Sequence, residues 1–125
     1  MTKVLISGNR SIKTLPIEAI ASIERIIAQN FHIIIGDADG VDSLVQQYLK
    51  KQGYQKVTVY YAKFNSLGKP RNHHGFPTVS VAGNYSNRDR MMCSIADYGL
   101  AIWDGRSSGT RANINRVPLT RIIQG

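Results

Sequence analysis

FHIIIGDADGVDSLVQQYL, residues 31–49, places a short apolar run, a turn rich in glycine and aspartate, and an amphipathic segment in direct succession. The run 31–35 has the length and composition of a buried strand, and Gly36 ends it. The apolar side chains after the turn recur at a three-four spacing, which indicates a helix over 41–52. They are Val41, Leu44, Val45, Tyr48 and Leu49. This stretch therefore predicts a strand, a polar turn and a helix, which is the repeating unit of α/β proteins.

The same alternation continues in both directions along the chain. The further elements that we expect are strands at 3–7, 56–62 and 98–103, and helices at 16–30, 87–97 (with Ser86 as N-cap) and 111–116. For 119–123 two interpretations stay open: an edge strand, or a chain that ends before the final strand and leaves an open edge that favours dimerisation. The pattern predicts a Rossmann-like three-layer α/β sandwich with a mostly parallel sheet of four or five strands and helices on both faces.

Residues 63–85 show no hydrophobic period and contain three glycines and two prolines. We expect a long loop here that serves as a functional lid or is mobile, because structureless loops of this length are uncommon inside compact domains. The adjacent His73 and His74 lie in it without a third ligand of the right kind nearby, so no metal site is expected.

Composition limits the class of protein. The 125 residues suit one domain over 1–125, and the single cysteine, Cys93, excludes a disulfide framework. Neither a signal peptide nor a membrane span is expected, which favours a cytoplasmic protein. The net charge of +8 divides into +2 over residues 1–62 and +6 over residues 63–125, and a basic surplus attracts phosphate groups.

Polar, glycine-containing turns follow three of the expected strands. They contain Gly8, Asn9 and Arg10 after the first strand, Gly36, Asp37, Asp39 and Gly40 after the second, and Asp104, Gly105, Ser107, Ser108, Gly109 and Thr110 after the fourth. In an open α/β sheet these turns converge at the carboxyl edge, where ligands bind. The last turn precedes a helix, so its N–H groups can bind an anion, although ordinary helix capping explains the same residues.

The carboxylates of the second turn allow several roles. Asp37 and Asp39 can accept ribose hydroxyls, bind a divalent metal, or pair with Arg10 or Arg88, and Asp42 suits the first turn of the following helix. Neither the dinucleotide fingerprint GxGxxG nor the phosphate loop GxxxxGK[ST] occurs. A calcium loop is not expected, because the glutamate that ends such a loop is missing.

Three stretches together resemble the SLOG superfamily of Rossmann-like nucleotide-binding proteins: SGNRSI at 7–12, IIIGDADGVDSLV at 33–45 and RDRMMCSIADYGLAIWDGRSSGT at 88–110. That superfamily includes the lonely-guy phosphoribohydrolases and the DNA-processing protein A family. The resemblance implies that Arg88 and Met92 match the arginine and methionine of the hydrolase branch, and that Gly109-Thr110 match its phosphate turn. Asn113 stands where that branch has its glutamate, and an amide cannot perform the proton transfers of a carboxylate.

Three functions stay open from the sequence. The first is a protein, such as a sensor, that binds a nucleotide or ribose-phosphate derivative at the strand ends without a cofactor or metal. The second is an N-glycosidic hydrolase or transferase with Arg88 in its site and Asp37 or Asp39 as the carboxylate, since Asp89 is expected to face another direction on its helix. The third is a DNA- or RNA-binding module. A homodimer or higher homo-oligomer is also expected.

Overall fold

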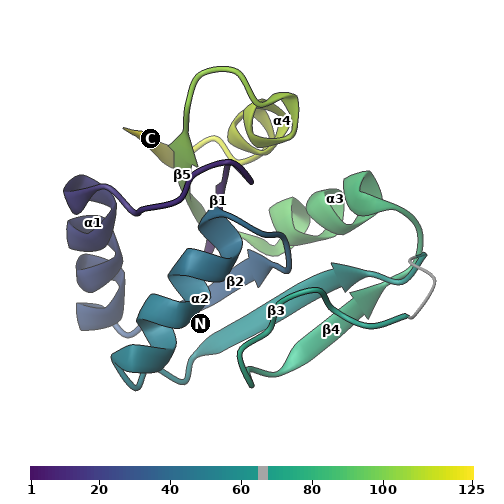
Figure 1. The fold of residues 1–125 in the computed structure, drawn as a ribbon, viewed down its shortest axis with the longest axis horizontal. Helices are drawn as coiled ribbons and strands as arrows, with labels where there is room; N and C mark the ends of the chain where they lie inside the picture. The colour runs from purple at the N-terminus through teal and green to yellow at the C-terminus, as the bar shows by residue number, and fades with distance from the viewer. Residues whose placement is uncertain (65–67) are drawn as a thin grey trace.

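The computed structural model describes residues 1–64 and 68–125, and it shows an α/β fold (Figure 1). The elements in chain order are β1 (Lys3–Gly8), α1 (Ile17–Ala28), β2 (His32–Gly36), α2 (Val41–Lys51), β3 (Val57–Ala62), β4 (Thr78–Val81), α3 (Tyr85–Ile95), β5 (Tyr98–Trp103), α4 (Ser108–Arg116) and β6 (Thr120–Gln124). All the strand pairs are parallel, and the order across the sheet is β4-β3-β2-β1-β5-β6. The Rossmann-like class that the sequence predicts is therefore confirmed.

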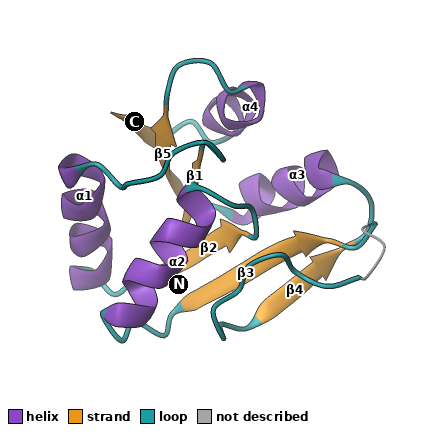
Figure 2. Ribbon diagram, viewed as in Figure 1, coloured by secondary structure: helices purple, strands orange, loops and turns teal. Residues whose placement is uncertain are grey.

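Helices cover both faces of the sheet (Figure 2). Ala19 and Ile23 of α1 share one hydrophobic cluster with residues of α2 and with Val4 and Ile6 of β1. Met92 and Cys93 of α3 share a second cluster with Leu5 of β1. Because side chains alternate along a strand, the two clusters lie on opposite faces of the sheet, and the molecule has three layers.

The chain leaves β1 toward one edge of the sheet and later returns to its other side. Strand β2 pairs with one side of β1 (Leu5 with Ile34), and β5 pairs with the other (Leu5 with Gly99). The strand order therefore reverses between β1 and β5, and the turns that follow these two strands lead to different sides of the sheet. Open α/β sheets form a crevice for a ligand at the carboxyl edge where the strand order reverses.

The sequence-based expectation of a structureless segment over 63–85 is wrong, because β4 lies inside it. Strand β4 pairs with β3, with Val59 opposite Thr78 and Ala62 opposite Val81, and brings the number of strands to six instead of four or five. Three of its four residues are exposed, so TVSV has no apolar run by which to recognise it. Residues 65–67 of the expected loop lie outside the described residues.

Two helix starts also differ from expectation. Asn84, and not Ser86, is the N-cap of α3, where its side chain accepts from the Asn87 N–H in a capping box. Helix α4 begins at Ser108, three residues before its expected start at 111, because the Ser107 hydroxyl caps it by accepting from the Thr110 N–H.

The final strand is present. Strand β6 pairs with β5 in parallel, with Ala101 opposite Ile122, so the interpretation in which the chain ends before this strand is wrong. Among the described residues, no helix is both long enough and apolar enough to cross a membrane.

Candidate functional site

An open pocket of about 150 Å³ lies at the carboxyl edge of the sheet, between the turns after β1, β2 and β5 and the helices α3 and α4. The candidate residues from the sequence that line it are Gly8, Arg10, Gly36, Arg88, Ser107, Gly109, Thr110 and Asn113. The structure adds Ile6, Ser7, Ala38, Asp42, Arg71, Tyr85, Asp89 and Met92. The candidates outside the lining are Asn9, Asp37, Asp39, Gly40, Asp104, Gly105 and Ser108.

Glycines at the ends of β1 and β2 let the surrounding elements approach closely. A Cβ atom on Gly8 would lie 2.4 Å from the carbonyl oxygen of Ile102 and 2.6 Å from Cγ2 of Val41. A Cβ atom on Gly36 would lie 2.6 Å from Oδ2 of Asp42 and 3.1 Å from Cζ of Arg88. Both positions therefore require glycine, and Gly36 does so because charged side chains of the pocket occupy the adjacent space.

Asn9 holds the turns together. Its N–H donates to Ile102, its carbonyl accepts from the Val41 N–H at 3.1 Å, and its side-chain oxygen accepts from the Asp104 N–H at 3.1 Å. With 6% of its surface exposed, Asn9 joins β1, α2 and β5 and does not line the pocket.

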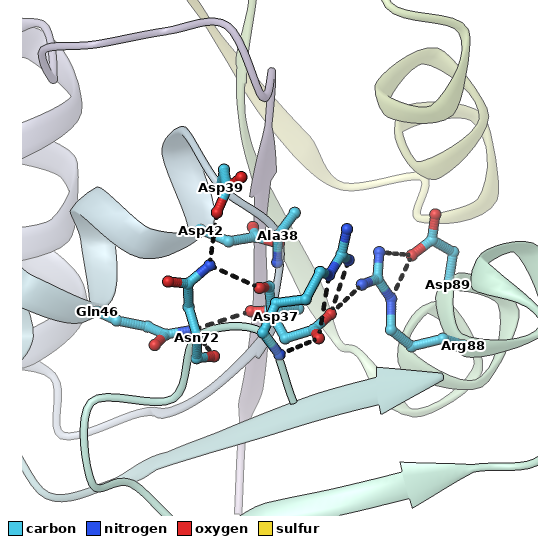
Figure 3. Close-up of polar contacts among 10 residues, drawn as sticks. Asp37, Ala38, Asp39, Asp42, Gln46, Asn72, Arg88 and Asp89 are labelled. Carbon is cyan, nitrogen blue, oxygen red and sulfur yellow. Dashed lines mark hydrogen bonds and ion pairs between the residues drawn. The ribbon is translucent and has the colours of Figure 1, made fainter. Parts of the chain in front are cut away.

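Asp37 is fully buried and holds two arginines (Figure 3). Its Oδ1 accepts from Nη2 of Arg71 at 2.8 Å and from Nη1 of Arg88 at 2.7 Å, and its Oδ2 accepts from the backbone N–H of Arg71 at 2.8 Å. Burial alone would raise the pKa of Asp37, but the hydrogen bonds and charge of Arg71, together with Arg88, hold it below its usual value. Of the roles that the sequence leaves open for Asp37, the structure shows the ion pair with Arg88.

Asp39 is exposed and does not line the pocket. Its Oδ1 accepts from Nδ2 of Asn72 at 2.9 Å, and the same Nδ2 donates to the carbonyl of Asp37 at 3.0 Å. Figure 3 shows Asn72 between the two aspartates. Asp39 therefore helps to attach the segment after β3 and does not reach a ligand in the pocket.

Fully buried Gln46 of α2 anchors the same segment. Its Nε2 donates to the carbonyl of Gly36 at 3.0 Å and to the carbonyl of Asn72 at 3.1 Å. Its Oε1 lies 2.8 Å from Nδ1 of His74, and Phe76 packs in the main hydrophobic cluster. Residues 71–76 are therefore attached to the protein by hydrogen bonds to Gln46 and by the packing of Phe76, and the mobility expected for 63–85 stays a prediction.

Asp42 is a buried carboxyl on the first turn of α2 that lines the pocket. Its Oδ2 accepts from the Ala38 N–H at 3.2 Å. Burial raises the pKa of Asp42 to about 7, against the opposing charge of Arg88. The carboxyl therefore exchanges its proton near neutral pH, and this distinguishes it from Asp37.

Asp89 faces the pocket, contrary to the expectation that it points elsewhere. Its Oδ1 accepts from both Nε and Nη2 of Arg88, at 3.1 and 2.8 Å. The guanidinium of Arg88 thus lies between Asp37 and Asp89, and Tyr85 lies beside it with its ring centroid 5.3 Å from Cζ. Arg88 and Asp89, although neighbours in sequence, therefore form an ion pair at the pocket.

The N-terminus of α4 forms the other side of the pocket. Asp104 accepts from the N–H groups of Arg106 and Ser107, and Ser107 accepts from that of Thr110. Within the described residues, the Gly109 N–H has no acceptor, and a Cβ atom on Gly109 would meet nothing within 4 Å. This end of the pocket therefore offers an open N–H at a helix N-terminus, where anions are favoured.

Asn113, at the position of the expected glutamate, is buried in the pocket lining. Its Oδ1 accepts from Sγ of Cys93 at 3.5 Å, and burial raises the pKa of that thiol. Among the described residues, no group of three or more histidine, cysteine or acidic side chains has the arrangement of a metal site.

Sequence reasoning missed Arg71, Tyr85 and the role of Asp42. Arg71 and Tyr85 contact one another, with Cζ of Arg71 4.2 Å from the ring centroid, but they lie 14 positions apart, one inside the aperiodic segment 63–85 and the other at its end. Nothing in their spacing points to the sheet edge. A position on the first turn of a helix already explains an aspartate at residue 42, so the sequence does not indicate that Asp42 is buried.

No family model, curated protein or solved structure matches the chain. The similarity to the SLOG superfamily therefore rests on the three quoted stretches alone. The Rossmann-like topology rests on the strand order and the parallel pairing of this structure.

Proposed function

We propose that the pocket binds a ribose phosphate or a nucleotide, with the phosphate at the N-terminus of α4. The observation that carries this proposal is that Gly109, with its open N–H, and Arg10 line the same pocket. The Arg10 side chain forms no ion pair with any of the described residues, so its positive charge is available to a ligand. A helix N-terminus and a guanidinium both suit phosphate, the first through its N–H groups and dipole and the second through its charge and bidentate geometry.

The charge distribution agrees with a phosphate at this end of the pocket. Arg71 and Arg88 are already paired with Asp37 and Asp89, whereas Arg10 has no such partner among the described residues. The acidic side chains gather around Arg88, and the hydroxyls of Ser107 and Thr110 lie at the start of α4. A ligand that is anionic at one end and rich in hydroxyls at the other matches this division.

A ligand screen tests the proposal directly. Unfolding of the full chain is followed with inorganic phosphate, ribose 5-phosphate, nucleoside mono- and diphosphates, and short single-stranded DNA. A ligand at about 100 times its Kd stabilises the protein by about 2.7 kcal/mol, which gives a clear shift in Tm. We expect shifts with the sugar phosphates. A shift with DNA alone, declining as salt increases, would favour the nucleic-acid module instead.

Two arginine variants locate the binding site. Arg10→Gln removes a pocket charge, and Arg106→Gln removes an equal charge from an exposed residue outside the lining. We expect Arg10→Gln to weaken sugar-phosphate binding by roughly 10- to 100-fold, the typical value of a charge-assisted hydrogen bond, and Arg106→Gln to change it little. Equal effects of the two variants would place the anion elsewhere.

One observation favours an N-glycosidic hydrolase or transferase as a second function. Asp42 and Asp89 line one pocket in different environments, and the raised pKa of Asp42 suits a general acid near neutral pH. Asp42 and Asp89 replace Asp37 and Asp39 as the carboxylates of this hypothesis. Release of free base from nucleoside monophosphates, abolished in Asp42→Asn, tests it.

Assembly into a homodimer stays a separate prediction, which sedimentation analysis tests.

A further inference from the structure

The inner end of the pocket contains two carboxyl groups that both interact with Arg88. Asp89 receives two hydrogen bonds from the guanidinium, and both of them end on Oδ1. Within the described residues, Oδ2 of Asp89 has no partner. The positive charge of Arg88 also acts on the carboxyl of Asp42, and both side chains lie next to the position that a Cβ atom on Gly36 would occupy.

Asp42 has one carboxyl oxygen without a hydrogen-bond partner among the described residues. The residue is 6% exposed, and its Oδ2 accepts from the Ala38 N–H at 3.2 Å. No donor or acceptor in the part of the chain that the structure describes pairs with Oδ1. Since every buried side-chain nitrogen or oxygen among these residues has a partner, Oδ1 is accessible to solvent, and Asp42 lines the pocket. Oδ1 is therefore free to pair with water or with a ligand in the pocket.

The protonation of Asp42 defines what its partner must offer. Because burial raises the pKa of Asp42 to about 7, the carboxyl is neutral below that pH and bears an O–H group. Since Oδ2 accepts from Ala38, the proton on Oδ1 is the one directed at the ligand. Asp89, paired with Arg88, remains an acceptor.

We propose that this end of the pocket binds the two adjacent ring hydroxyls of a phosphorylated ribose, with one hydroxyl hydrogen-bonded to Oδ1 of Asp42 and the other to Oδ2 of Asp89. A hydroxyl both donates and accepts, so two adjacent hydroxyls satisfy the two free oxygens together. This inference rests on the proposed function, because the phosphate at α4 sets which end of the sugar reaches Arg88.

The proposal predicts selectivity for ribose over 2-deoxyribose. Removing one hydroxyl leaves a carboxyl oxygen of the occupied pocket without its partner, and sites built to hydrogen-bond a hydroxyl reject analogues that lack it. We expect ribose 5-phosphate to bind at least about tenfold more tightly than 2-deoxyribose 5-phosphate at pH 6.5, a conservative figure for one lost buried hydrogen bond.

Binding is also linked to proton uptake. The charged groups that face Asp42 are Arg88 and Asp89 of α3 and Asp37 at the end of β2, and Arg10 and Arg71 line the same pocket. The arginines stay charged, and the ligand phosphate, with its second pKa near 6, is a dianion above pH 7. Asp42 is then the group that must regain a proton, and affinity falls by up to about tenfold per pH unit above 7.

The experiment is titration calorimetry of the full chain with the two sugar phosphates at pH 6.5, 7.5 and 8.5. In Asp42→Asn the amide oxygen still accepts from Ala38, and its NH₂ replaces the O–H directed at the ligand. We therefore expect the affinity of this variant for ribose 5-phosphate to stay constant from pH 6.5 to pH 8.5, the range over which that of the wild type declines. Asp89→Asn should weaken binding at every pH, and the control Asp39→Asn should match the wild type.

The outcomes separate this inference from the proposed function. If neither sugar phosphate nor inorganic phosphate binds, the proposed function fails and this inference fails with it. If inorganic phosphate competes with both sugar phosphates but the two sugars bind equally, the phosphate site stands and the hydroxyl site is overturned. A wild-type decline with pH that persists unchanged in Asp42→Asn also overturns it.

Discussion

Nη1 of Arg88 lies 2.7 Å from Oδ1 of Asp37, a buried ion pair that joins α3 to the end of β2. The same carboxylate accepts from the side chain and the backbone of Arg71, so one buried acid fixes two walls of the pocket. This arrangement fixes the position of Arg88, and the positive charge of Arg88 is balanced by its acidic partners. Arg10 is left as the pocket arginine without an acidic partner among the described residues.

Asp37→Asn should destabilise the protein by about 3–5 kcal/mol, because it leaves the guanidiniums of Arg88 and Arg71 without their shared carboxylate. Urea unfolding of this variant beside Asp39→Asn, whose carboxylate is exposed, measures the effect. We expect a change below about 1 kcal/mol in the control. Equal, small effects in both variants would show that the pair does not hold the fold together.

Asp37 also makes stability depend on acid. Its pKa is lowered in the folded protein, so its contribution is present above the unfolded value of 3.8 and is lost as the pH falls through the folded pKa. The gap in the free energy of unfolding between the wild type and Asp37→Asn should therefore narrow as the pH falls below 3.8. A gap that stays constant below that pH would contradict this assignment.

Asp42 has the opposite pH dependence. Its folded pKa of about 7 lies above the unfolded 3.8, so the wild type loses about 1.4 kcal/mol of stability per pH unit across that window, roughly 4 kcal/mol in all. Asp42→Asn carries no such charge, and its advantage over the wild type should grow from pH 4 to pH 7 and then level off. Denaturant unfolding at several pH values measures this, and parallel pH profiles would exclude a raised pKa.

Two glycines of the pocket should respond differently to alanine. Gly36→Ala places a methyl group 2.6 Å from Oδ2 of Asp42, so we expect a loss of about 1–3 kcal/mol from overpacking. Gly109→Ala enters open space on the first turn of α4 and should be neutral or stabilising by up to about 1 kcal/mol. Thermal unfolding of the two variants measures the difference in Tm. Equal losses of Tm would show that the space around Gly36 is wider than in the structure.

Gln46→Leu should release the segment 71–76 from α2. The variant removes the donors to Gly36 and Asn72 and the partner of His74, and we expect a loss of about 1–3 kcal/mol. The amide hydrogen of Arg71, which donates to Asp37, should also exchange faster with deuterium. Gln47→Leu is the matched control, because Gln47 contacts Ser43 on the exposed face of α2. Identical exchange in the two variants would contradict an anchoring role for Gln46.

The sequence predicts most of the fold, because its strong signals coincide with buried elements. The run at 31–35 and the helix period that begins at Val41 correspond to β2 and α2, and both are buried against the sheet core. Strand β4 could not be predicted, because its exposed TVSV carries no period and its pairing with β3 is a tertiary property. Local patterns predict elements well where burial requires them and poorly at an edge.

The candidate site was predictable in place but not in detail. Topology alone places the turns after β1, β2 and β5 at one edge, and Gly8, Gly36 and Gly109 line the pocket there. Which aspartate faces the pocket depends on side-chain packing: Asp37 is taken by two arginines, and Asp42 is not. Arg71 reaches the pocket through a segment whose sequence has no period, so only the structure reveals it.

The affinity of Gly109→Asp for ribose 5-phosphate tests the central claim most directly. A carboxylate on the first turn favours the helix but repels a phosphate, and the position has room for a side chain. Ser108→Asp adds the same charge one residue earlier, outside the pocket lining. We predict a fall of at least about tenfold for Gly109→Asp, from like charges at close range, with a much smaller change for Ser108→Asp and no loss of Tm in either. Wild-type affinity in Gly109→Asp would contradict a phosphate at the N-terminus of α4.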